Sequence, residues 1–93
     1  HEERGAIHDE YVVELLEVFG GMENIRVMKV MDRSLFITVY DMDFVDEQRL
    51  LKLCAYHLAK AEYCYELAAG NQAFALQQAL QRLQEKELQQ LLL

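Results

Sequence analysis

The chain has 93 residues, of which 53 % are hydrophobic, and it carries a formal net charge of −7 at pH 7. A chain of this length holds one core, so we expect a single domain over 1–93, with its core at about 8–84 and a tail at 85–93. The nine Lys and Arg residues are scattered among sixteen acidic residues, which argues against a nucleic-acid partner. No apolar run approaches the roughly 20 residues of a membrane-spanning helix, so we expect no membrane insertion by this segment.

The two cysteines, Cys54 and Cys64, stand in a sequence with no signal peptide and no dense cysteine framework. This usage is typical of a reducing compartment, and we expect a cytoplasmic location. Because the chain opens on His1 rather than Met, it is expected to be a domain of a larger protein. Cys54, His57 and Cys64 lack the fourth ligand and the paired cysteine motif of a structural zinc site, so we predict no metal and no cofactor.

A helix and a hairpin are predicted in the first half of the chain. Apolar residues between Asp9 and Gly20 fall on one helical face, with Asp9 as its cap and Gly20 at its end. Two segments of alternating character follow at 25–30 and 35–40. The polar break at 31–34 between them predicts a hairpin with a four-residue loop.

Residues 54–69 allow two interpretations. A second helix begins near Asp46, and the alanine-rich sequence beyond it favours one long helix over 46–69, which gives the order α-β-β-α-α. Short alternations on either side of 60–62 instead permit a second hairpin that turns there. Propensity and alternation disagree here, and both interpretations stay open on this evidence.

A last helix is predicted over 73–93, after the break at Gly70 and Asn71. Leu76, Leu80 and Leu83 share one face of it. Beyond 84 this apolar stripe loses its register, so the tail at 85–93 either frays in solvent or docks on a partner. One such partner is a second copy of the chain, joined through this helix.

Three blocks in the centre of the chain stand at gap-free spacing: FGGMENI at 19–25, TVYD at 38–41 and VDE at 45–47. Together they resemble the enzyme IIB domain of the glucose class of the bacterial phosphoenolpyruvate-dependent sugar phosphotransferase system (PTS), over 10–70 in register. The resemblance implies an α+β fold in the order α-β-β-α-β-β-α, with an antiparallel sheet and helices packed on one face. We take this fold as the main prediction.

The resemblance also implies a site. In such domains a cysteine in the loop between the first two strands takes a phosphoryl group from a IIA partner and passes it to a sugar. Counting from Asn24, that position is Met31, and the positions of the two usual arginines are Ser34 and Phe36. A thioether has no proton to lose and forms no phosphothiol ester, so we predict no catalytic residue here.

The sequence therefore predicts a non-catalytic IIB-like domain that serves as a protein-binding or regulatory module linked to the PTS. The expected partner is a protein, either IIA-like or regulatory. Two alternatives stay open: an active PTS IIB component, and a helical adaptor or oligomerisation domain. The candidate binding residues surround the first hairpin loop, and they are Arg26, Met31, Asp32, Arg33, Ser34 and Phe36.

Overall fold

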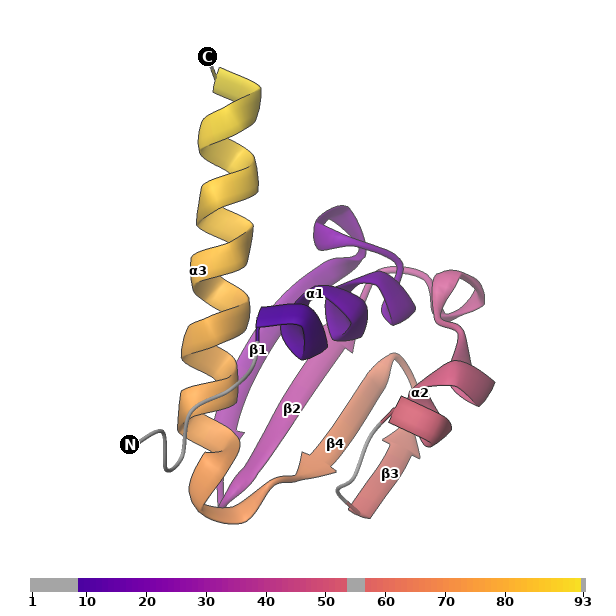
Figure 1. Ribbon diagram of the computed structural model, residues 1–93. Helices are drawn as coiled ribbons and strands as arrows, with labels where there is room; N and C mark the ends of the chain where they lie inside the picture. The colour runs from indigo at the N-terminus through magenta and orange to yellow at the C-terminus, as the bar shows by residue number, and fades with distance from the viewer. Residues whose placement is uncertain (1–8, 54–56, 93) are drawn as a thin grey trace.

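A four-stranded antiparallel sheet in the order β1-β2-β4-β3 is the centre of the computed structural model, which describes residues 9–53 and 57–92. The helices α1, α2 and α3 lie on one face of this sheet (Figure 1). The elements in chain order are α1 (Asp9–Val18), β1 (Ile25–Met31), β2 (Ser34–Val39), α2 (Glu47–Leu53), β3 (His57–Ala61), β4 (Cys64–Ala68) and α3 (Ala73–Leu92). Three short 3₁₀ turns connect them: η1 (Met22–Asn24), η2 (Met42–Phe44) and η3 (Gly70–Gln72).

The predicted order α-β-β-α-β-β-α is confirmed, and the alternative of one helix over 46–69 is wrong. α2 ends at Leu53, and the hairpin of β3 and β4 follows. β4 pairs with the central strand β2, and Tyr65 and Leu67 on β4 are buried. This long-range pairing outweighs the helix propensity of the alanines, because local propensity is worth only tenths of a kcal/mol per residue. The turn lies at Glu62 and Tyr63 rather than at 60–62, with Tyr63 at φ 61°.

The first hairpin is tighter than the sequence predicted. β1 extends to Met31 and β2 begins at Ser34, so the loop has two residues rather than four. A β-bulge near the start of β1 leaves Arg26 unpaired, since Ile25 faces Val39 while the next pair joins residues 27 and 38. The extra residue reverses the alternation, so Ile25 is buried whereas residues 27 and 31 are exposed.

The core lies between the sheet and the helices. It is built from alternate residues of the strands and from the inner sides of the helices. Its fully buried members are Leu15, Val18 and Phe19 near α1, Leu35 and Ile37 on β2, Leu50 on α2, Leu67 on β4, and Leu76 and Leu80 on α3. Since strand side chains alternate between faces, residues 34, 36 and 38 of β2 point to the opposite face, which no helix of the described residues covers.

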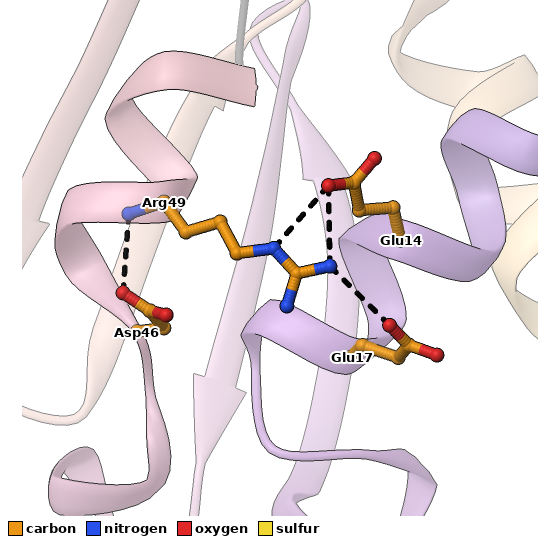
Figure 2. A network of polar contacts seen from close by, with 4 residues as sticks. All are labelled: Glu14, Glu17, Asp46 and Arg49. Atoms are coloured by element: carbon orange, nitrogen blue, oxygen red, sulfur yellow. Dashed lines mark hydrogen bonds and ion pairs between the residues drawn. The ribbon is translucent and has the colours of Figure 1, made fainter.

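Helix α2 is capped at its start by Asp46. The Asp46 carboxylate accepts a hydrogen bond from the backbone N–H of Arg49 at 3.1 Å and caps the helix (Figure 2). Asp43 does not take part in this cap; its own N–H donates to the Asp41 carboxylate, which caps η2. Asp43 and Asp46 therefore do not form a capping box, and the caps of η2 and α2 are separate.

Helix α3 runs along the sheet beside β1 and extends past it (Figure 1). The tail at 85–93 is helical as far as Leu92, where the described residues end. Among the described residues, no helix combines the length and the apolar character needed to cross a membrane.

Candidate functional site

The turn between β1 and β2 holds four of the six candidate binding residues. Asp32 at φ 51° and Arg33 at φ 65° both adopt the left-handed conformation, as the two central residues of a type I′ hairpin turn require. Aspartate tolerates this conformation, whereas arginine adopts it at a cost of about 1 kcal/mol. Tertiary contacts must therefore hold Arg33 in place.

Those contacts come from the start of η3. The Gly70 N–H donates to the Arg33 carbonyl at 2.8 Å, and the Arg33 guanidinium donates to Asn71 Oδ1 at 3.1 Å. Gly70 itself has φ 62°, which points its N–H toward the turn at no steric cost. The hairpin tip is thus joined to the connection between β4 and α3, and the Arg33 side chain is already engaged by a neutral amide.

Ser34 is buried beside this turn, with 4 % of its surface exposed. Its hydroxyl donates to Glu66 Oε2 at 2.8 Å across the sheet. Burying a hydroxyl without a partner is costly, so this bond satisfies the serine and orients the carboxylate. At the position where the resemblance implies an arginine, the chain places a neutral group that is hydrogen-bonded to an anion.

Met31 and Phe36 give this end of the uncovered sheet face an apolar surface. Met31 is paired with Ser34 and is 52 % exposed, and Phe36, half-buried, is paired with Lys29. Val27, 39 % exposed, lies on the same face of β1, and the exposed Lys29 stands between it and Met31. Apolar groups exposed on a sheet face that no described helix covers are typical of a contact surface.

The structure does not bring Arg26 to the turn. Arg26 is exposed at the bulge, five residues before Met31, which corresponds to about 16 Å of strand. Cys64 is also distant: it pairs with Thr38, four residues along β2 from Ser34, or about 13 Å of strand. Cys54 lies outside the described residues. Arg26 therefore does not join Arg33 in a cluster of cations at the turn.

A second cluster, which the sequence analysis did not find, joins α2 to the second hairpin. The Tyr65 hydroxyl donates to Glu47 Oε2 at 2.7 Å, and Lys60 Nζ lies 3.0 and 3.1 Å from the two oxygens of that carboxylate. A cavity of about 200 Å³ adjoins them, with Leu51 on its wall. The partners are 13 and 18 residues from Glu47, and no local spacing signals such a contact.

The titration of this cluster follows from its contacts. The hydrogen bond from Tyr65, and after it the one from Lys60, lowers the pKa of Glu47. Burial, and after it the Glu47 carboxylate, raises the pKa of Tyr65. Two donor groups already make three hydrogen bonds to the carboxylate, so its role is to fix α2 against the sheet rather than to bind a ligand.

No protein-family model matches this chain, and no curated protein matches it either. Within 9–53 and 57–92, no three His, Cys, Asp or Glu side chains lie close enough together to hold a metal ion. Of the three residues that were considered as metal ligands from the sequence, Cys54 and His57 lie where the structure describes no side chains. The turn between β1 and β2, with the apolar surface beside it, is the candidate site.

Proposed function

We propose that this chain is a non-catalytic IIB-like domain, and that it binds a IIA-like protein through the turn between β1 and β2. The observation that carries the proposal is Met31, exposed at the end of β1 where the resemblance implies the phosphocysteine. We further propose that the domain acts as a regulatory module of the PTS in the bacterial cytoplasm.

The chemistry of the turn argues against phosphoryl transfer. A phosphoryl acceptor needs a thiolate and cationic partners for the dianionic group. Met31 supplies a thioether, Ser34 is occupied by Glu66, and Phe36 carries no charge. A phosphoryl group placed here would also lie beside the Glu66 carboxylate, which repels it.

The surface beside the turn favours a protein partner instead. Met31, Phe36 and Val27 offer apolar contact area on a face with no covering helix among the described residues. Methionine adapts to a partner surface through its three rotatable bonds, and it is common at protein contacts. The rigid hairpin tip, tied at Arg33, holds this area in one position.

Two measurements test the proposal. The chain is incubated with phosphoenolpyruvate, the general phosphotransferase proteins and a glucose-class IIA, and its intact mass is compared with that of an ordinary IIB domain treated alongside. We expect no phosphoryl adduct on this chain while the control is labelled. A 1:1 adduct would show an active IIB component and overturn the non-catalytic assignment.

Binding is tested by NMR titration of the isotope-labelled chain with the unphosphorylated IIA. Amide shifts should concentrate at 31–36, and Met31→Lys should weaken the affinity at least tenfold. Leu88→Lys is the matched control, because Leu88 is 51 % exposed and belongs to the C-terminal part of α3, which extends away from the turn (Figure 1), so the affinity of this variant should stay unchanged. Shifts elsewhere, or equal losses in both variants, would refute binding at this turn.

A further inference from the structure

A groove runs between α1 and α3 on the outer side of the helical layer. Its volume is about 490 Å³. Apolar side chains from both helices line it, together with two cations, one glutamate and one glutamine from α3; the residues concerned are Val12, Val13, Ala79, Leu83, Arg82, Lys86, Glu85 and Gln89. Within the described part of the chain, neither Arg82 nor Lys86 forms an ion pair.

Val13 separates this groove from an acidic strip. A shallower hollow on its other side is lined by Glu10, Glu14 and Glu17 of α1, and by Arg49 of α2. The helical turn of 100° per residue puts the three glutamates to one side of Val13, while Val12 lies to the other. Val13 is 41 % exposed. It is therefore an apolar centre with the acidic strip on one flank, while on the other flank the two cations of α3 outnumber the single carboxylate of Glu85.

The charges of the acidic strip are only partly neutralised. The Arg49 guanidinium lies 3.1 Å from a Glu14 oxygen and 3.3 Å from a Glu17 oxygen, and it joins α1 to α2 (Figure 2). Glu10 has no ion pair among the described residues. One cation thus serves three carboxylates, and the strip remains net negative.

We infer that this face is a symmetric interface for a second copy of the chain. A two-fold axis through Val13, perpendicular to the line from anions to cations, places the acidic strip of each copy against Arg82 and Lys86 of the other. Such a self-complementary patch is what an isologous dimer requires. The two-fold axis also repeats every contact between opposite charges, so each contact occurs once on either side of the axis.

Charge considerations favour a second copy over random association. Two chains of net charge −7 repel each other at long range, and a contact with opposite charges in register offsets that repulsion and fixes one orientation. Val13 and the apolar floor of the groove would be buried at the centre of the interface, with the charges around them, as in the usual anatomy of protein interfaces. The inference is independent of the proposed function, since its surface lies in the helical layer and not at the hairpin turn.

The oligomeric state of the full chain gives the first test. Sedimentation equilibrium should show a mass that rises with concentration from 10.9 kDa toward twice that value. With a dissociation constant of about 1 mM, half of the chains would be dimeric at about 1 mM total chain. A mass that stays at 10.9 kDa up to this concentration overturns the inference.

A charge exchange identifies the face. One variant carries Arg82→Glu and Lys86→Glu. The other carries Glu10→Lys and Glu17→Lys, and it keeps the ion pair between Glu14 and Arg49. Each variant alone should be monomeric because like charges meet at both contacts. Their equimolar mixture should form a heterodimer with opposite charges at both contacts. Dimers of either variant alone, or a mixture that stays monomeric while both chains are folded, would overturn the inference.

Two further variants separate the interface from folding and from net charge. Val13→Glu places like charges at the axis without touching Arg49, and it should abolish the dimer while the circular dichroism spectrum is unchanged. Lys29→Glu with Lys52→Glu changes the net charge as much as the α3 variant does, at exposed positions away from the groove, and it should remain dimeric. Loss of the dimer in this control would show a general charge effect and refute the assigned face.

Discussion

The Tyr65 hydroxyl donates a 2.7 Å hydrogen bond to Glu47 Oε2, and this bond joins the central region of the sheet to the first turn of α2. The Tyr65 ring is 1 % exposed and meets Phe19 edge to face, with 5.4 Å between ring centroids. A single side chain therefore connects the core to a partly exposed ion pair, because Glu47 also binds Lys60.

Tyr65→Phe should lower the free energy of unfolding by about 1–2 kcal/mol. The ring keeps its packing against Phe19, while the charge-assisted hydrogen bond to Glu47 is lost. Urea unfolding followed by circular dichroism measures the change. Tyr63→Phe is the control, since Tyr63 is 46 % exposed and should change stability by less than about 0.5 kcal/mol. Equal effects in the two variants would contradict a special role for the bond.

The pH dependence of stability should report both members of this pair. The pKa of Glu47 is lowered in the folded chain, so its contribution is present above the ordinary value of 4.5 and is lost as the pH falls through the folded value. The pKa of Tyr65 is raised, so its contribution is present below the ordinary value of 10.0 and is lost as the pH rises toward the folded value.

Unfolding free energies measured between pH 3 and pH 12 for the wild type, Glu47→Gln and Tyr65→Phe check these signs. The advantage of wild type over Tyr65→Phe should shrink above pH 10, and its advantage over Glu47→Gln should shrink below pH 4.5. Salt should reduce the acid effect, because the Glu47 side chain is 41 % exposed. A pH-independent difference in either variant would contradict the assignment.

Asn24→Ala should destabilise the chain by about 3 kcal/mol. Asn24 is 3 % exposed, its amide donates to the carbonyls of Phe19 and Asp41 at 2.7 and 2.9 Å, and its Oδ1 accepts from the Asp41 N–H at 3.0 Å. Each lost bond costs about 1 kcal/mol, and the buried backbone groups are left unsatisfied. Chemical denaturation measures the loss, with exposed Gln48→Ala as the control. A change below about 1 kcal/mol would show that water replaces the amide.

Gly20→Ala should cost about 2–3 kcal/mol and should exceed the cost of Gly70→Ala. Gly20 has φ 97°, and a Cβ there would lie 2.9 Å from both Asn24 Nδ2 and Phe44 Cβ. Gly70 has φ 62°, and its Cβ would meet nothing closer than 3.8 Å, so only the conformational cost of about 1 kcal/mol applies. Thermal unfolding of both variants tests the order, and the reverse order would refute this assignment of steric crowding.

The central block FGGMENI has a structural explanation in this chain. Gly20 supplies the positive φ and the close approach, and Asn24 binds the two neighbouring backbone segments. Neither residue belongs to the candidate site. The block therefore explains how the chain enters β1, and it carries no information about the function of the domain.

The elements that local patterns determine were predictable, and those that depend on distant contacts were not. The helix from Asp9 and the first hairpin follow from apolar spacing and were found to within a few residues. The bulge at Arg26 and the tightness of the turn escaped prediction, because Gly70 and Asn71 stabilise Arg33 from 37 and 38 residues away. The second hairpin stayed ambiguous because its stability comes from pairing with β2.

The candidate site shows the same division. The sequence located the turn, but it could not indicate that Ser34 donates to Glu66, since the two residues are 32 positions apart. It grouped Arg26 with the turn, although the bulge is at the other end of β1. The cluster of Glu47, Lys60 and Tyr65 carries no motif, because helix and hairpin bring these side chains together only in the folded chain.

The strand order has a consequence for how the chain folds. β1 with β2 and β3 with β4 are hairpins between sequence neighbours, whereas the joining pair of β2 with β4 brings Leu35 to Leu67. Hairpins form within about 1–10 μs, while the joining pair must wait for a much longer loop to close. We therefore expect a transition state in which both hairpins exist and the pairing between β2 and β4 is forming. Substitutions at Leu67 should then slow folding, whereas substitutions near the end of α3 should mainly speed unfolding.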